Sequence, residues 1–264
     1  MSYFGFLLRF LVIPILVFLA ITWRDNRRGK PTRGFADGRA VWTAILVHII
    51  IAVVYTTPWD NYLVATGVWY YNPELVTGIV LGYVPIEEYT FFVLETLLAG
   101  LWWWFLARRI PEPAEAFKPS VNVRLTAFGI LAAAWLVFTY LLFLGGREWT
   151  YLAIIFFWAL PAIFPQMLYG ADILWHHRRL VLAGILVPGT FLSLTDIIAL
   201  TDTTWSIAKD QTSGILFFGI LPIEEVVFFF ITIILINFGM TLLLSNIGRQ
   251  RFADWKARRY KGLP

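Results

Sequence analysis

The tetrapeptide Pro-Ile-Glu-Glu occurs twice in this chain, each time inside an apolar stretch long enough to cross a lipid bilayer. The copies occupy residues 85–88 and 222–225, and aromatic residues follow each of them closely. A carboxylate near hydrocarbon is costly, so acidic residues in such segments usually mark a functional site. Polar residues that only join helices are the alternative, but Asn or Ser would do this at lower cost. The repeated acidic pair therefore predicts a functional site.

The composition excludes an ordinary soluble domain. Of the 264 residues, 59% are hydrophobic and only 14% are charged, whereas soluble domains carry about a quarter of charged residues. The chain contains no Cys, which excludes disulfides, a thiolate nucleophile and Cys-ligated zinc. The net charge is +4, but the basic residues lie in short loops, where they set topology. We therefore expect a protein of the lipid bilayer that does not bind nucleic acid.

Seven apolar segments approach the roughly 20 residues that a bilayer core requires. They cover residues 3–22, 40–57, 78–106, 125–144, 150–170, 180–200 and 214–244. The first lacks the basic start and the cleavage site of a signal peptide, so we interpret it as a helix. The third and seventh exceed a minimal span, which favours a tilt, or a kink at Pro85 and Pro222. The prediction is an all-α integral membrane domain over residues 1–264, with no strands.

The basic residues fall on one side of the predicted membrane. They occupy the loops after the first, third and fifth spans and the tail 249–264, whereas the other side has only Arg147 and Lys209. Because Lys and Arg remain cytoplasmic, this asymmetry predicts a multi-pass protein of the cell membrane. Its N-terminus should lie outside and its C-terminus in the cytoplasm. We expect the basic tail to lie on the anionic inner leaflet.

The repeat extends beyond the tetrapeptide. Asp60 precedes Trp69 by nine residues, and Asp196 precedes Trp205 by nine. The two Trp residues precede the motif prolines by sixteen and seventeen residues. We therefore expect repeat one at about 1–110, a linking helix at about 120–146 and repeat two at about 147–248. The linking helix restores the chain direction, which makes the repeats parallel and relates them by a pseudo-two-fold axis along the membrane normal.

Acidic pairs in an aromatic setting favour proton chemistry on an apolar substrate. Burial disfavours a charged carboxylate, and neighbouring carboxyls cannot all ionise cheaply. A carboxylic acid beside a carboxylate could protonate a carbon–carbon double bond and later accept a proton. Aromatic faces stabilise the cation between these steps, and exclusion of water protects it. Residues that could supply such faces are Trp69, Trp205, Phe91, Phe92, Phe228 and Phe229, although ordinary packing or lipid contact would explain any one of them.

Two Pro-x-Glu-Glu motifs, each preceded by Asp-x8-Trp, resemble the membrane-integral carotenoid cyclases. The resemblance covers nearly the whole chain and implies lycopene β-cyclase activity. In that activity the acyclic ψ-ends of lycopene, or of another acyclic carotenoid, become β-ionone rings without net redox change, giving γ-carotene or β-carotene. It implies that the catalytic and substrate-binding motif residues are Glu87, Glu88, Glu224, Glu225, Asp60, Asp196, Pro85 and Pro222.

The four motif glutamates should lie near one another around the pseudo-two-fold axis. The halves are nevertheless not equivalent, because Glu95 follows Glu88 on nearly the same helix face. Thr232 stands at the matching position of the second copy.

Other functions require residues or motifs that can be looked for in this sequence. Other lycopene cyclases are flavoproteins, but no Gly-x-Gly-x-x-Gly motif is present, so we expect no flavin and no other cofactor. His176 and His177 lack a third ligand, so we expect no metal. A retinal protein needs a lysine in its last span, and 214–244 has none. A carotenoid hydratase of the same superfamily, a transporter with internal repeats and a lipid-binding scaffold remain alternatives.

Overall fold

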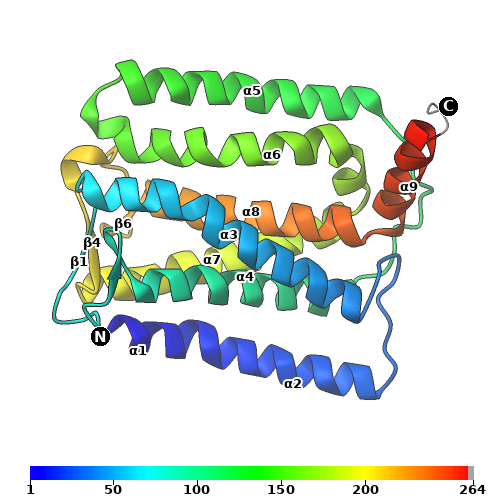
Figure 1. Cartoon of the computed structure of the whole chain (residues 1–264), viewed down its shortest axis with the longest axis horizontal. Helices are drawn as coiled ribbons and strands as arrows, with labels where there is room; N and C mark the ends of the chain where they lie inside the picture. Colours follow the sequence, from blue (N-terminus) through cyan, green and yellow to red (C-terminus); the bar gives the residue numbers. More distant parts are fainter. Residues whose placement is uncertain (261–264) are drawn as a thin grey trace.

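A computed structural model describes residues 1–260, and it confirms an all-α membrane architecture with seven helices long and apolar enough to span a bilayer (Figure 1). The first spanning segment combines α1 (Tyr3–Leu7), a π-helical turn η1 (Leu8–Val12) and α2 (Ile13–Arg27). The other six are α3 (Arg39–Ala65), α4 (Ile86–Ala107), α5 (Val121–Leu144), α6 (Thr150–His176), α7 (Arg178–Thr201) and α8 (Ile223–Leu244). A last helix, α9 (Asn246–Tyr260), follows at the C-terminal end.

The expectation of no strands is wrong, because six short strands within residues 1–260 gather at one end of the helices (Figure 1). They are β1 (Trp69–Tyr71), β2 (Val80–Leu81), β3 (Val84–Pro85), β4 (Trp205–Ile207), β5 (Leu216–Phe217) and β6 (Leu221–Pro222). β2 pairs with β3 and β5 with β6, which makes two hairpins. β1 and β4, which lie far apart in the sequence, pair with each other in antiparallel orientation. Short 3-10 helices, η2 (Arg147–Trp149) and η3 (Lys209–Gln211), complete this end.

The third and seventh spans are shorter than the sequence predicted, because residues before each motif form a hairpin. Pro85 and Pro222 are not kinks within a helix: each is the last residue of a strand and the N-cap of the next helix. Proline lacks an N–H and is well tolerated where a helix begins. An apolar hairpin running into an apolar helix cannot be told from one long helix by hydrophobicity alone.

The hairpins also account for the unequal spacing of Trp and Pro in the two halves. In the first hairpin Leu81 pairs with Val84 across two residues, and in the second Phe217 pairs with Leu221 across three. The extra residue of the second half therefore lies in its hairpin loop. Gly82 has φ +71° at the first position of the shorter loop, which is the conformation that a tight II′ turn requires.

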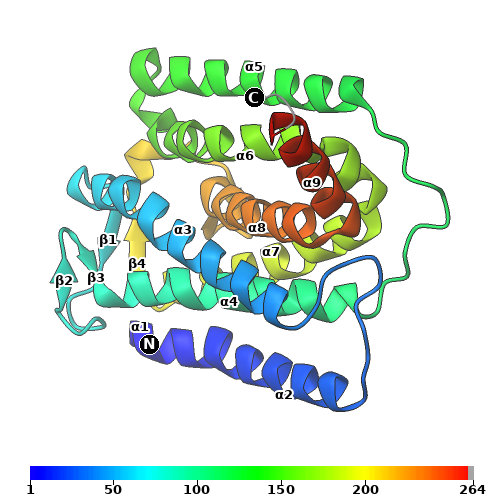
Figure 2. The ribbon, with the colours of Figure 1, turned by 45° about the vertical axis from the view of Figure 1, so that its right-hand side comes forward.

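The helices that carry the motifs lie at the centre of the bundle. In the most apolar part of α4 and of α8, about two thirds of the residues are buried within the protein. In the corresponding part of α5, no residue is buried. α5 packs on the outside of α6, at the edge of the molecule in both views (Figures 1 and 2). The central helices can therefore hold polar groups away from lipid, whereas α5 packs one side on α6 and exposes the other.

Among the described residues, the ion pairs with a deeply buried partner lie at the end of the bundle opposite the hairpins. Arg108 lies 2.9 Å from Asp37, and Arg251 lies 2.8 Å from Asp172. Burial acts to raise the pKa of the Asp37 carboxyl, but hydrogen bonds from the Gly38 N–H and from Arg108 outweigh this effect and leave that pKa below its usual value. Asp37 is therefore ionised at neutral pH and compensates a buried guanidinium.

We predict that Asp37→Asn lowers stability by roughly 1–3 kcal/mol, because the buried Arg108 loses its charged acceptor. The measurement is thermal unfolding in detergent. Asp210→Asn is the matched control, since Asp210 and its partner Arg147 are both well exposed at 64% and 68%, and exposed ion pairs contribute little. Equal unfolding temperatures for the two variants would show that the Arg108 pair does not stabilise the fold.

Candidate active site

Each acidic pair lies in the first turn of a central helix, directly after a hairpin. The proline N-cap starts α4 and α8, so Glu87 and Glu88, and likewise Glu224 and Glu225, occupy helix N-termini. The first N–H groups of a helix have no partner within it, and the helix dipole favours negative charge there. The local sequence therefore places four carboxyls where a buried negative charge costs least.

The first glutamate of each pair binds the loop in front of its hairpin. Glu87 accepts a hydrogen bond of 2.6 Å from the N–H of Thr77, and Glu224 accepts one of 2.7 Å from the N–H of Ser213. Both side chains are fully buried. These two carboxyls therefore hold corresponding loops in place and do not line the cavity described next.

The second glutamate of each pair accepts hydrogen bonds from tyrosine. Tyr3 donates to Oε2 of Glu88 at 2.5 Å, Tyr71 donates to the same oxygen at 3.0 Å, and Tyr151 donates to Oε1 of Glu225 at 2.6 Å. Burial first, and then the nearby Glu88 carboxyl, raises the pKa of the Tyr71 phenol well above its ordinary value. Tyr71, in the loop strand β1, is therefore a permanent donor to Glu88.

Glu88 and Glu225 meet at one small cavity. Its volume is about 30 Å³, which is room for roughly one water molecule. Apart from the two carboxyls, the described side chains around it are all aromatic: Tyr3, Trp69, Tyr71, Phe91, Trp205, Phe228 and Phe229. Phe91 of α4 faces Phe229 of α8 with ring centroids 6.1 Å apart. The cavity is thus lined by aromatic side chains and by the carboxyl groups of two glutamates.

Asp60 and Asp196 lie beside this cavity, not in its lining. Both are fully buried, and both lie within electrostatic range of Glu88. Asp196 accepts a hydrogen bond of 2.9 Å from the indole of Trp205. Asp60 accepts none from any described residue. The upstream acids therefore join the same cluster of carboxyls, with different partners in each half.

The two halves also meet at the matched pair Glu95 and Thr232. The Thr232 hydroxyl donates to Oε1 of Glu95 at 2.7 Å, linking the centres of α4 and α8. This contact lies two helical turns beyond Glu88, on the other side of Phe91 and Phe92. The position at which the sequence repeat breaks down is thus where the two motif helices touch.

Three of the residues expected to contact substrate are not in the cavity lining. Pro85 and Pro222 end their hairpins, and both lie buried at the helix starts. Phe92 packs between Tyr89 and Phe91. The other expected aromatic residues, namely Trp69, Trp205, Phe91, Phe228 and Phe229, all line the cavity.

The tyrosines that bind the carboxyls were not predicted from the sequence. Tyr3 and Tyr151 each lie at the start of the first helix of a half. Phe10 and Pro14 in the first helix have the same four-residue spacing as Phe157 and Pro161 in α6, but Tyr3 precedes Phe10 by seven residues and Tyr151 precedes Phe157 by six. This offset of one residue concealed their correspondence. The π-helical turn at Leu8–Val12 accommodates the extra residue, because a π turn holds one more residue than an α turn. One residue inserted between Tyr151 and Phe157 brings the two tyrosines into register, so the signal in the sequence is a spacing with one insertion.

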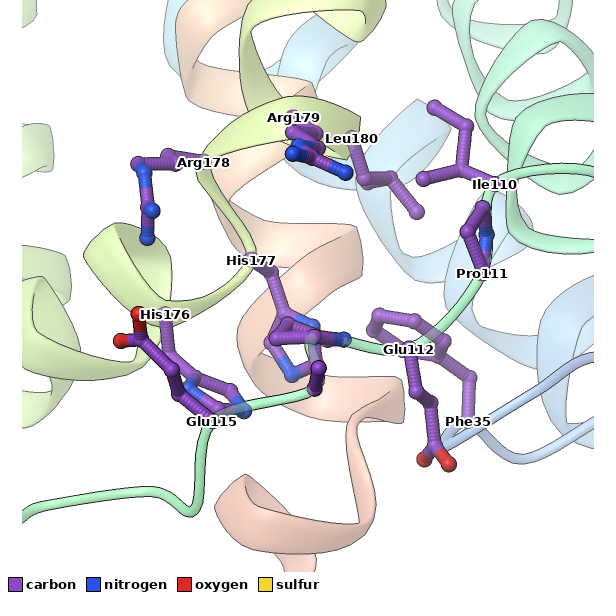
Figure 3. A pocket seen from close by; sticks show the side chains of 12 residues that line it. Phe35, Ile110, Pro111, Glu112, Glu115, His176, His177, Arg178, Arg179 and Leu180 are labelled. Carbon is purple, nitrogen blue, oxygen red and sulfur yellow. The ribbon is translucent and has the colours of Figure 1, made fainter.

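A second cavity, of about 160 Å³, lies at the opposite end, near the loop 110–115 and the start of α7 (Figure 3). His176 and His177 line it together with Arg178, Arg179 and two glutamates. Burial first, and then neighbouring His176, lowers the pKa of His177 to about 4, so this imidazole is neutral at physiological pH. Among the described residues no three acidic or imidazole groups are placed to hold a metal ion. This cavity is remote from the acidic motifs.

Fold and site together define a multi-pass membrane protein with two acids in an aromatic cavity. The family model described as lycopene cyclase matches residues 35–106 and 148–247, which include both motifs. The chain therefore belongs to the lycopene cyclase family.

Curated relatives carry corresponding names. A lycopene beta-cyclase of Halobacterium salinarum is 40% identical over 216 residues, which is 81% of this chain and 88% of the relative. A bifunctional lycopene cyclase/phytoene synthase of Podospora anserina is 34% identical over 201 residues, covering 74% of this chain and 34% of that protein. A Gibberella fujikuroi protein of the same name is 31% identical over 225 residues, covering 82% and 37%. No solved structure matches this chain.

We predict that Glu224→Leu destabilises the protein by roughly 1–3 kcal/mol, because the partly buried N–H of Ser213 loses its acceptor. Glu224→Gln keeps an acceptor oxygen and should recover most of the loss. The measurement is thermal unfolding in detergent, together with proteolysis at the loop around Ser213. An unchanged unfolding temperature in Glu224→Leu would contradict a loop-holding role for this carboxyl.

Proposed function

We propose that this chain is a lycopene β-cyclase, which closes acyclic ψ-ends of lycopene into β-ionone rings. The observation that carries the proposal is the meeting of Glu88 and Glu225, from two separate motifs, at one aromatic cavity. The family and the name of the Halobacterium relative support the same substrate and product. They favour cyclisation over transport or a scaffold role.

The reaction needs one proton donor and one proton acceptor. A carboxylic acid adds its proton to the terminal double bond of the ψ-end, which leaves a tertiary cation on the neighbouring carbon. The next double bond along the chain attacks that cation, and the new carbon–carbon bond closes the ring. A proton then leaves the ring carbon beside the new cation, and a carboxylate takes it. One proton enters and one leaves, so no oxidant or reductant is required.

The surroundings of the two carboxyls suggest their roles. Glu88 accepts two phenolic hydrogens and Glu225 accepts one, and hydrogen bonds to a carboxylate stabilise its charged form. We assign Glu88 as the base and Glu225 as the acid. The phenols of Tyr3, Tyr71 and Tyr151 are positioning groups, because they orient the carboxyls.

The aromatic side chains that line the cavity stabilise the carbocation intermediate. Faces of Trp69, Trp205, Phe91 and Phe228 can stabilise positive charge without donating a pair of electrons to a new bond. The small volume of the cavity keeps bulk water away, which favours ring closure over capture of the cation as an alcohol. Glu87 and Glu224 contribute through the loops that they hold, whereas Asp60 and Asp196 supply neighbouring carboxyls through which protons can return.

We infer that the enzyme acts in the cell membrane with its hairpin end outside and its C-terminal end in the cytoplasm. The basic loops and the buried Arg108 and Arg251 pairs all lie at the end that carries α9. Because positively charged loops remain cytoplasmic, this end is assigned to the inside. The acidic site would then lie toward the outer half of the bilayer.

We predict that Glu88→Gln and Glu225→Gln each lower kcat by about 10²–10⁴-fold, because Gln can neither donate nor accept the proton. KM should change less, since Gln keeps the size and polarity of Glu. Glu87→Gln and Glu224→Gln, one residue away, are the matched controls and should retain most of the activity. Pigment analysis in a lycopene-accumulating host and kinetics in liposomes measure these effects. Full activity of Glu88→Gln and Glu225→Gln would remove both carboxyls from the mechanism.

A further inference from the structure

The cavity at Glu88 and Glu225 is far too small for a whole carotenoid. With a volume of about 30 Å³, it holds roughly one water molecule. It can receive only the reacting end of the substrate, and only with some movement of its aromatic walls. The rest of the long, linear polyene must lie along another apolar surface of the protein.

A groove between α3 and α6 offers such a surface. Its outer part, of about 510 Å³, is lined by the stretch of α3 from Ile50 to Trp59 and by Trp158 of α6. Its inner part, of about 1120 Å³, lies between His48 and Ile51 of α3 and the segment 165–169 of α6, with α8 beside them. Ile51 lines both parts, so they adjoin each other, and we call the two together the α3–α6 groove.

The groove opens toward the lipid. Ile51 and Val54 are 55% and 68% exposed, and both lie within a helix of membrane-spanning length. Figure 1 shows α3 crossing obliquely over α8, close to α6 at the hairpin end and diverging from it toward the other end. An apolar ligand could therefore enter sideways from the bilayer without crossing water.

A single side chain, that of Trp59, lies between the outer end of the groove and the acidic cavity. Trp59 lines the groove, and its ring lies 5.7 Å from that of Trp69 and 5.7 Å from that of Phe228. Trp69 and Phe228 are themselves walls of the cavity. Rotation of the Trp59 indole would therefore join the two spaces.

The length and direction of the groove suit an extended chain. His48 and Trp59 are eleven residues apart on α3, and Trp158 and Tyr169 are eleven apart on antiparallel α6. At 1.5 Å per residue each distance is about 16 Å, around half of the bilayer core. The groove therefore follows the two helices for about half of the thickness of the bilayer core, and its inner part extends further, to α9.

Tyr55 and Trp158 join the two helices at the outer part of the groove. The Tyr55 hydroxyl donates to the Trp158 carbonyl at 2.9 Å, and the Trp158 indole donates to the Tyr55 carbonyl at 3.1 Å. The two rings stack with centroids 5.4 Å apart. Trp158 also lies 4.7 Å from Trp59, so this bridge fixes the separation of α3 and α6 next to the passage.

We propose that the polyene of the acyclic carotenoid binds in the α3–α6 groove, with its ψ-end passing Trp59 to reach Glu88 and Glu225. This inference rests on the proposed function, which supplies the substrate. The contact of the groove with the cavity through Trp59 identifies the occupant. The reacting end of this substrate must reach the two carboxyls, whereas an ordinary acyl chain has no reason to extend toward them. Lipid alone in the groove is the outcome that the experiment must distinguish.

Binding can be tested without turnover, because the chain contains no Cys. Ile51→Cys is made in a Glu225→Gln background and labelled in liposomes with an apolar thiol reagent. Lycopene at about ten times its Kd should slow labelling roughly tenfold by mass action. Leu136→Cys, on α5 with a similar exposure of 62%, is the control and should not change. Equal labelling of Ile51→Cys with and without lycopene would mean that only lipid fills the groove, and would overturn the proposal.

A second variant tests the groove through substrate length. Val54→Trp should fill the outer part and lower the rate with lycopene at least tenfold, yet spare a short acyclic analogue with the same ψ-end. Val137→Trp on exposed α5 is the matched control. Equal rate losses for long and short substrates would contradict the groove. Failure of the unmodified enzyme to cyclise either substrate, with protection of Ile51→Cys intact, would instead reject the proposed function alone.

Discussion

Hydrogen-bond donors stabilise a carboxyl group buried among aromatic rings, and the supply of donors to the four motif glutamates organises much of the protein. Proline ends each hairpin and starts a helix, which brings the unpaired N–H groups and the dipole of the helix end to the acidic pair. Loop N–H groups bind Glu87 and Glu224, and phenols bind Glu88 and Glu225. The hairpins, the loops and the first helix of each half therefore serve one purpose, which is to supply donors to acids inside a membrane protein.

The two halves supply hydrogen-bond donors to their glutamates in similar but not identical ways. β1 and β4 pair so that Trp69 faces Ile207 and Tyr71 faces Trp205, which places Tyr70 and Ser206 opposite each other at the centre of the pair. Tyr71 gives Glu88 a second phenol, and Ile207 at the matching position cannot do the same for Glu225. The halves also differ at Glu95 and Thr232, which contact each other. Such differences allow two copies of one motif to take opposite roles in a proton transfer.

Much of this arrangement could be predicted from the sequence, because a few strong signals controlled it. The length of the apolar segments gave the seven spans, and the cost of carboxylates near hydrocarbon indicated the site. The hairpins were missed, since Val80, Leu81 and Leu216 are as apolar as the helices that follow. Tyr3 and Tyr151 were missed because a one-residue insertion, accommodated by the π-helical turn, shifted their spacing. Within each pair, the first glutamate binds a loop and the second lines the cavity. This difference depends on the direction of each side chain, which hydrophobic patterning does not encode.

The central claim, that a carboxylic acid of this site starts the reaction by protonating carbon, is tested most directly by turnover in heavy water. An exchangeable carboxyl would carry deuterium, and the added atom stays on the product while a different hydrogen leaves. Mass spectrometry should therefore find one deuterium for each ring formed, at the carbon that was vinylic in the terminal double bond, with no gain of water. A cyclic product without deuterium would contradict proton addition by Glu88 or Glu225. An open-chain alcohol would show that water, and not the neighbouring double bond, captures the cation.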